Sequence, residues 1–378
     1  MVVIKMTKNV KVVIGSNYGD ESKGLMVRHF CQKSQNKTVV IFHNGTAQRG
    51  HTVDYNTNSR HVYHHFCSGT AEGIPTFFAK TFWIHPMEFV REYFELEEKY
   101  IYPPTAYCDP DALVITPFDM ITDHITEDWI ALQSGQREFG SCGFGTWCAT
   151  DRYPAHVYKV SDFLQFNEKK ILKDITEDCL ILLKNRDVDI EKIKYKQYLN
   201  INSVYWNNIA NHFINDLRFF FSKVNITSFD NIYEIFDTLI FENGQGLGLD
   251  QNVNNIWTTT SNTGVLNPFN MLVNKQGFKA EICYVTRPYI TRHGDGPLHN
   301  ECRLNIVDKT NIFNDFQGGL RFGHLSQDTF DRINKDFSTV VEDTRFRKTL
   351  AVTHMNEYFD KDLFNLATYK SDNPYEVR

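Results

Sequence analysis

The order of predicted elements near the start of the chain is the strongest constraint on the fold. Residues 10–15 (Val-Lys-Val-Val-Ile-Gly) are mostly β-branched and apolar, which predicts a buried strand. Residues 16–24 are small and polar, residues 25–33 carry apolar side chains at helical spacing, and residues 37–43 predict a second strand. Because a strand, a helix and a strand in this order form a right-handed βαβ unit, we expect an α/β fold with a mainly parallel central sheet and flanking helices.

Later segments extend this pattern. Residues 86–100 predict an amphipathic helix with proline in its first turn, and residues 160–235 predict helical packing material without chemistry. Ligands of open α/β sheets bind beyond the carboxyl ends of the strands, so we expect the loops after the strands to converge on one site. No repeat or low-complexity linker divides the chain, which favours a single domain over residues 1–378. The further predicted strands cover residues 111–117, 237–242, 281–286 and 348–353.

Composition argues against several classes of protein. The 378 residues carry a formal net charge of −6, so no basic field indicates nucleic-acid binding. No apolar run reaches the roughly 18 residues that a membrane helix needs. The first residues lack the apolar core of a signal peptide, so we expect a cytoplasmic protein. None of the eight cysteines forms a Cys-x-x-Cys pair, which predicts reduced and mostly buried thiols.

Two loops carry residue types that suit catalysis. The first has glycine at positions 15, 19 and 24 with Lys23 between them, a pattern that suits a phosphate or an ordinary strand-to-helix turn. It is not a Walker A loop, because Gly-Lys-Ser/Thr is absent. Asp20 in this loop and His51 after the second strand offer a carboxylate and an imidazole, which is a plausible base and acid pair. A histidine after glycine is also typical of a capping or core position.

Five motifs resemble those of adenylosuccinate synthetases and occur in the same order. Residues 15–24 (Gly-Ser-Asn-Tyr-Gly-Asp-Glu-Ser-Lys-Gly) resemble Gly-x-x-Trp-Gly-Asp-Glu-Gly-Lys-Gly, and residues 50–53 (Gly-His-Thr-Val) resemble Asn-Ala-Gly-His-Thr. The other three are similar to Phe-Glu-Gly-Ala-Gln-Gly with Leu-Asp, Thr-Ser-Ser-Asn-Thr and Thr-Arg-Val-Gly-Ala-Gly-Pro; they lie at residues 241–250, 259–263 and 291–297. The resemblance implies that family's fold, which is related to P-loop NTPases, and a homodimer.

The resemblance also implies a reaction. Enzymes of this family join L-aspartate to C6 of a purine nucleotide, after a nucleoside triphosphate has phosphorylated the 6-oxygen. The chain would be a ligase of purine biosynthesis that converts IMP to adenylosuccinate with GTP or ATP and Mg²⁺. Asp20 would be the base toward N1 and, with the carbonyl of Gly50, a Mg²⁺ ligand. His51 would donate a hydrogen bond or proton to the transferring phosphoryl group and O6, Lys23 would neutralise phosphate charge, and Gln245 would contact O6.

Further binding residues follow from the same resemblance. Thr259 and the loop at Ser141 would lie at the 5′-phosphate of the acceptor nucleotide, and Arg152 matches an arginine that a partner subunit lends to that phosphate. The residues expected to bind the acceptor nucleotide are Asp20, Gln48, Ser141, Cys142, Arg152, Gln245 and Thr259. Those expected to bind the triphosphate are Gly19, Glu21, Ser22, Lys23, Gly24, Gly50, His51, Thr52, His354, Asn356, Ser371 and Pro374.

Two substrate-reading motifs depart from the family pattern. The arginine-rich loop that binds aspartate is replaced by residues 316–323, in which Arg321 stays in register; we expect Arg321, Arg292 and Gln317 to bind aspartate, unless Arg321 is a solvated loop residue. The guanine-reading Thr-Lys-x-Asp motif is Thr353-His-Met-Asn356 here. Because an Asn side chain donates as well as accepts, the preference for guanine is weakened and ATP becomes a possible donor.

Other functions compete with this interpretation. Phage relatives of the family join aspartate to dGMP or GMP with ATP, which gives 2-amino-(deoxy)adenylosuccinate, the precursor of 2-aminoadenine. They are similarly short, but known members carry serine at the position of Asp20, so IMP is favoured. A non-enzymatic nucleotide-binding module predicts loss of Asp20 or His51, and a GTPase or kinase needs a Walker A loop. His61, His64 and His65 have permissive spacing for a metal, but a polar strand or loop is the simpler interpretation.

Overall fold

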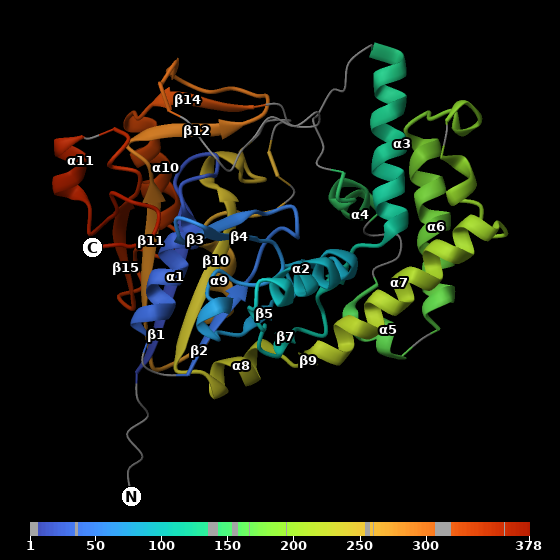
Figure 1. Ribbon diagram of the computed structural model, residues 1–378, viewed down its shortest axis with the longest axis horizontal. Helices are drawn as coiled ribbons and strands as arrows, with labels where there is room; N and C mark the ends of the chain where they lie inside the picture. Colours follow the sequence, from blue (N-terminus) through green and yellow to red (C-terminus); the bar gives the residue numbers. More distant parts are fainter. Residues whose placement is uncertain are drawn as a thin grey trace, which may run out of the picture.

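A computed structural model of the chain describes residues 7–34, 37–134, 143–152, 158–165, 167–193, 195–253, 258–259, 261–306, 319–358 and 360–378. Its centre is a nine-stranded sheet in which every neighbouring pair within the described residues is parallel (Figure 1). The order is β16-β15-β11-β1-β10-β2-β5-β7-β9, with β1 between β10 and β11. The predicted α/β fold with a mainly parallel sheet is confirmed.

The sheet strands have the following bounds. They are β1 Lys8–Gly15, β2 Thr38–Phe42, β5 Thr76–Phe78, β7 Ala106–Cys108, β9 Val224–Ile226, β10 Thr238–Gly246, β11 Phe278–Thr286, β15 Phe346–Val352 and β16 Tyr369–Lys370. Smaller sheets contain β3 His51–Asn56 with β4 Ser59–Tyr63, β6 Trp83–Ile84 with β8 Leu113–Val114, and β12 Tyr289–His293, β13 Glu301–Cys302 and β14 Leu320–His324.

The helices cover both faces of the sheet and build a separate layer beside it. They are α1 Lys23–Lys33, α2 Pro86–Glu98, α3 Pro117–Ser134, α4 Thr146–Arg152, α5 Val160–Gln165, α6 Glu168–Asn185, α7 Val204–Lys223, α8 Phe229–Ile235, α9 Leu266–Leu272, α10 Gln327–Phe337 and α11 Lys361–Leu366. Helices α3 to α7 form the layer on the right of Figure 1, away from β1. Among the described residues no helix is both long and apolar enough to span a membrane.

Successive side chains of the central strands join two different apolar clusters, which explains why helices pack on both faces of the sheet. In β1, Val10, Val12 and Ile14 join one apolar cluster with α8, α9 and α10, whereas Val13 joins a second cluster with α1, α2, α3, α6 and α7. Strand β2 divides in the same way, with Val39 on the first face. Successive side chains of a strand point to opposite faces, so an apolar run without alternation must be buried on both sides. The βαβ prediction depended on this feature.

Two details of the predicted elements were wrong. Of residues 111–117, only Leu113–Val114 form a strand, and it pairs with β6 outside the main sheet because α3 begins at Pro117. Residues 160–235 are not helical throughout, since Val224–Ile226 form β9 at the edge of the sheet. Strands β5, β7 and β9 have three residues each, which is too short for a period to be read from the sequence.

Arg152 lies inside the helical layer. Its Nε atom is 2.5 Å from Asp119 Oδ1 and its Nη2 atom donates to Asp119 Oδ2 at 3.2 Å, and both side chains are buried. Asp119 also accepts the backbone N–H and the hydroxyl of Thr116, so this carboxylate ties the start of α3 to the end of α4. Arg152 is thus buried and paired within its own chain, and its place at a dimer interface stays a prediction.

The buried Asp119–Arg152 pair gives a stability prediction. Arg152→Met should lower the free energy of unfolding by about 3–5 kcal/mol, because the Asp119 carboxylate would stay buried without its cation. The measurement is urea unfolding followed by circular dichroism. Arg91→Gln is the matched control: Arg91 pairs with Glu88 and Glu95 on the surface of α2, and its loss should cost less than about 1 kcal/mol. Equal losses in the two variants would show that the Arg152 pair does not stabilise the fold.

Candidate active site

The loop between β1 and α1 is built around the buried side chain of Glu21. Its Oε1 atom accepts the backbone N–H groups of Asn17 and Gly19, each at 3.0 Å, and its Oε2 atom is 3.0 Å from Lys23 Nζ. A Cβ atom at Gly15 would come within 2.5 Å of Glu21 Oε2, so only glycine fits there. Glu21, which was expected to bind the triphosphate, thus holds the loop from within.

This loop contains three residues with left-handed backbone conformation, at φ of 100° for Gly19, 65° for Asp20 and 67° for Ser22. For the two non-glycine residues this conformation is unfavourable, by about 1 kcal/mol or more each. Side chains from outside fix it: Arg287 Nε donates to the Asp20 carbonyl at 2.6 Å, and Thr353 Oγ1 donates to the Glu21 carbonyl at 3.0 Å. Two successive carbonyls of the strained backbone are therefore fixed by donors from outside the loop.

Asp20 is half-buried and lines a cavity together with Lys23 and His51. Burial raises the pKa of Asp20 above its usual value, while the charge of Arg287 opposes this shift and that of Glu21 adds to it. Among the described residues, none donates a hydrogen bond to the Asp20 carboxylate. A carboxylate with a raised pKa and free oxygens suits a proton acceptor, and its oxygens are also the kind of ligand that Mg²⁺ prefers.

His51 is held by a carboxylate that the sequence analysis did not assign. Its Nδ1 atom is 2.5 Å from Glu242 Oε1, and Ser68 donates to the same carboxylate through its hydroxyl at 2.5 Å and its backbone N–H at 3.1 Å. Burial lowers the pKa of His51 to about 4, although the charge of Glu242 opposes the shift. Burial alone would raise the pKa of Glu242, but the interactions with His51 and Ser68 bring it below its usual value. The imidazole is therefore neutral, with Nδ1–H donating to Glu242.

The cavity has a volume of about 420 Å³ and lies at the carboxyl edge of the sheet. Loops that follow β1, β2 and β15 and the hairpin of β3 with β4 contribute to its wall. The convergence of these loops was predicted from the sequence and is confirmed. Most of the residues that we expected to bind the triphosphate or to act in catalysis line this cavity. They are Asp20, Ser22, Lys23, Gly24, Gly50, His51, Thr52, His354, Asn356 and Pro374. Gly19 and Glu21 are not among the lining residues, and neither is Ser371, whose hydroxyl donates to the carbonyls of Asn373 and Glu376.

Several residues expected to bind the acceptor nucleotide lie on neighbouring loops. Gln48 Oε1 accepts from the Thr146 hydroxyl at 3.2 Å, which joins the loop after β2 to α4. Gln245 is half-buried in β10 with a left-handed backbone at φ 63°, and the Thr259 N–H donates to the Leu249 carbonyl at 2.8 Å. Ser141, Cys142 and Gln317 lie outside the described residues.

The two arginines expected to bind aspartate face one another in a small antiparallel sheet. Arg292 in β12 is directly opposite Arg321 in β14. Arg292 donates to the carbonyls of Asp295 and Pro297 and lies over the Tyr18 ring at 4.8 Å. Arg321 makes two contacts with the Glu301 carboxylate, at 2.8 and 2.5 Å, and donates to two backbone carbonyls. Arg321 is therefore not a solvated loop residue.

Sequence reasoning missed other residues of the cavity. Arg287 follows β11 directly, so the strand-end rule could have found it. Asn56 ends β3, Thr57 lies in the turn and Arg60 lies in β4 of the same hairpin, which no motif marks. Glu242 was present in the motif at residues 241–250, but only the fold shows that it meets His51.

The histidines between residues 61 and 65 have structural partners. The carboxylate of Glu92 accepts the backbone N–H groups of His64, His65 and Phe66. In the described part of the chain, the one group of candidate ligands that could share a metal is Asp119, Cys148 and Cys179, and Asp119 is paired with Arg152. All described cysteines are free thiols, and each is buried except Cys302, which is half-buried.

Comparisons with known proteins agree with these motifs. A sequence model of the family described as adenylosuccinate synthetase matches residues 12–324. The adenylosuccinate synthetase of Clostridium botulinum (strain Alaska E43 / Type E3) is 26% identical over 311 residues, which cover 79% of this chain and 66% of that protein. The enzyme of Mycoplasma mycoides subsp. mycoides is 25% identical over 318 residues, covering 80% and 67%. The match thus spans about two thirds of the length of these relatives.

Solved structures share the fold. A fully ligated adenylosuccinate synthetase of Plasmodium falciparum has a TM-score of 0.65 at 17% identity, covering 92% of this chain and 77% of that one. The succinoaminodeoxyadenylate synthetase PurZ of cyanophage S-2L, bound to dGMP and to dATP as an energy donor, has a TM-score of 0.63 at 12% identity, covering 98% and 95%. The family match extends over most of the central sheet and the loops after β1 and β2, and the chain belongs to the adenylosuccinate synthetase family.

Proposed function

We propose that the protein is a ligase that joins L-aspartate to C6 of a purine nucleotide and hydrolyses a nucleoside triphosphate. IMP is the acceptor and adenylosuccinate the product in this proposal. The observation that carries it is the placement of Asp20, Lys23 and His51 around one cavity, in a chain of the adenylosuccinate synthetase family. These are the side chains that a phosphoryl transfer to O6 requires as base, cation and hydrogen-bond donor.

The roles of Asp20 and His51 follow from their surroundings. Asp20 takes the proton from purine N1, and its raised pKa makes it a better base than an exposed carboxylate. His51 is neutral when the cavity holds no anion, because burial lowers its pKa to about 4. Triphosphate charge beside the ring favours the protonated form, so substrate binding prepares His51 to donate to the transferring phosphoryl group. Glu242 accepts from Nδ1 and so fixes the ring in its donor tautomer.

The residues of the cavity fit a Mg²⁺ ion. The Asp20 carboxylate and the Gly50 carbonyl would hold it, and both are hard oxygen donors that line the cavity. When bound, the ion neutralises charge on the phosphates. Lys23 adds a second positive charge, although its ammonium is already 3.0 Å from Glu21 Oε2. Arg292 and Arg321 receive the carboxylates of aspartate.

Similarity to the cyanophage enzyme supports one second candidate. The similarity to the cyanophage enzyme covers 95% of that protein, whereas the similarity to the Plasmodium enzyme covers 77%. The alternative acceptor is dGMP or GMP, with ATP as donor and a 2-aminoadenylosuccinate nucleotide as product. Retention of Asp20 favours IMP. The homodimer and the cytoplasmic location stay predictions.

One prediction of this proposal concerns the reaction itself. Purified protein with aspartate, Mg²⁺ and either ATP or GTP should release phosphate and form the succinylated nucleotide with IMP, and the assay is repeated with dGMP and GMP. Asp20→Asn should reduce turnover by at least about 10³-fold, because the amide cannot accept the N1 proton. Product with dGMP and none with IMP would favour the second candidate, and no product with any pair would refute the ligase proposal.

A second prediction tests the contact between Glu242 and His51. Glu242→Gln should lower kcat by about 10²-fold with little change in KM, because the amide no longer fixes the imidazole tautomer. Ser68→Ala is the matched control, since it removes one hydrogen bond to the Glu242 carboxylate and leaves His51 in contact with Glu242. We expect this variant to lower kcat by less than about tenfold. Equal kcat values in Glu242→Gln and wild-type protein would contradict the positioning role of Glu242.

A third prediction concerns the choice of donor. The wild-type protein should accept ATP, because the Asn356 amide can donate as well as accept. Asn356→Asp should shift the ratio of kcat/KM for GTP over ATP upward by at least about tenfold, since a carboxylate accepts from both guanine N–H groups. Asn56→Asp adds the same charge elsewhere in the cavity and controls for repulsion of the triphosphate. A shift of the same size in both variants would remove Asn356 from base recognition.

A further inference from the structure

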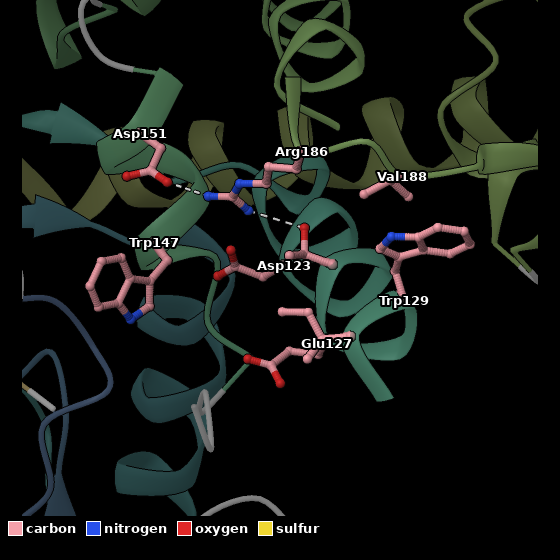
Figure 2. Close-up of a pocket in the computed structure, with 9 residues that line it drawn as sticks. Asp123, Glu127, Trp129, Trp147, Asp151, Arg186 and Val188 are labelled. Atoms are coloured by element: carbon pink, nitrogen blue, oxygen red, sulfur yellow. Dashed lines mark hydrogen bonds and ion pairs between the residues drawn. The ribbon is translucent and has the colours of Figure 1, made fainter. Parts of the chain in front are cut away.

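The helical layer contains a second cavity of about 320 Å³. It lies between α3, α4 and the segment after α6, and it shares no lining residue with the catalytic cavity. Figure 2 shows Asp123 near its centre, with the indole rings of Trp147 and Trp129 on opposite sides. The proposed reaction uses none of these side chains.

Asp123 is the residue of this cavity that most needs a partner. Its side chain is 4% exposed, and its Oδ1 atom accepts the backbone N–H of Cys148 at 2.9 Å. Its Oδ2 atom is inaccessible to solvent and has no hydrogen-bond partner within the described part of the chain. A buried carboxylate oxygen without a donor is unfavourable, so the site is incomplete as the described residues build it.

The nearby cation does not satisfy Asp123. Arg186 follows α6 and points into the cavity, but its Nη1 atom donates to the Thr126 hydroxyl at 3.1 Å and its Nη2 atom pairs with Asp151 (Figure 2). Glu127 also lines the cavity. Because Arg186 binds Thr126 and Asp151, it leaves Asp123 Oδ2 without a donor among the described residues, and a further positive group there would be favourable.

The rest of the lining suits an apolar body that carries such a group. Trp147 is 41% exposed and Trp129 is partly buried, so each presents ring surface to the cavity. Indole is the ring that attracts cations most strongly, and this attraction adds to that of a buried carboxylate. An inorganic cation would use the carboxylates but leave the apolar lining without a partner, whereas an organic cation uses both.

We propose that this cavity binds a small organic cation of the amidinium or guanidinium type, with its N–H groups on Asp123 and its apolar part against Trp129 and Trp147. A planar cation of this type places two parallel N–H donors, which matches a carboxylate with a vacant oxygen. The proposal rests on the geometry of the helical layer and not on the ligase reaction.

Benzamidine is the probe, and isothermal titration calorimetry of the full chain at about pH 8 is the measurement. We expect saturable binding with a Kd at or below about 1 mM, and binding at least about tenfold weaker in Asp123→Asn, which keeps the shape of the side chain and removes its charge. Asp151→Asn is the matched control, because the Asp151 carboxylate is already paired with Arg186, and it should change the Kd less. Benzamide, which has a similar shape and no charge, should not bind.

The pH dependence supplies an independent readout. Burial raises the pKa of Asp123 to about 7; Asp119 and Glu127 add to the shift, and the Cys148 N–H and the charge of Arg186 oppose it. The cation requires the ionised carboxylate, so affinity should rise about tenfold from pH 6 to pH 8 in wild-type protein and stay level in Asp123→Asn.

Two outcomes would overturn the proposal. One is the absence of benzamidine binding in wild-type protein, and the other is equal binding in wild type and Asp123→Asn. Asp123→Asn should keep its circular dichroism spectrum and its turnover of IMP, so a lost binding signal in a folded variant identifies the cavity. If no ligase activity is found in either protein, the calorimetry still decides this proposal by itself.

Discussion

The candidate active site depends on one buried carboxylate, that of Glu21. It binds two backbone N–H groups of its own loop and pairs with Lys23 at the start of α1. Three successive carbonyls of the same loop then accept donors from side chains that lie in or directly after later strands. Thr291 binds the Gly19 carbonyl, Arg287 that of Asp20, and Thr353 that of Glu21. The unfavourable backbone conformation at Asp20 is therefore a consequence of the folded sheet, since these donors are distant in sequence.

The same dependence on distant strands applies to His51. The residue begins β3, whereas Glu242 belongs to β10 in the middle of the central sheet. Because both groups are almost completely buried, the hydrogen bond between them decides which ring nitrogen carries the proton. A parallel sheet brings the two together because β10 lies between β1 and β2, the strands whose loops carry Asp20 and the segment before His51. The central position of β10 is thus needed both for the order of strands in the sheet and for the contact between Glu242 and His51.

These contacts explain how far the sequence could predict the molecule. The strands at residues 10–15, 37–43, 281–286 and 348–353 were predictable because apolar side chains must be buried on both faces there. The short strands at the sheet edge, β7 and β9, have no readable period. Motif order could place Asp20 and His51 at neighbouring loops, but not Glu242 or Arg287 beside them, since a pair distant in sequence leaves no local pattern. The pairing of Arg152 with Asp119 could not be predicted either, because a sequence match does not show which way a side chain turns.

The substrate-reading loops show where this chain differs most from the family pattern. With the arginine-rich loop absent, Arg292 and Arg321 lie opposite each other on β12 and β14. Burial lowers the pKa of Arg292, and the charge of Arg321 adds to this shift. Glu301 relieves the repulsion between the two arginines through two contacts with Arg321, in the geometry that a substrate carboxylate would use. Under the proposed function, an incoming aspartate must therefore displace Glu301 or bind through Arg292, whose guanidinium lies over the ring of Tyr18 in the loop that carries Asp20. Because Arg292 already contacts that loop, the proposal places aspartate next to the phosphoryl acceptor, where one arginine would serve in place of the family's several.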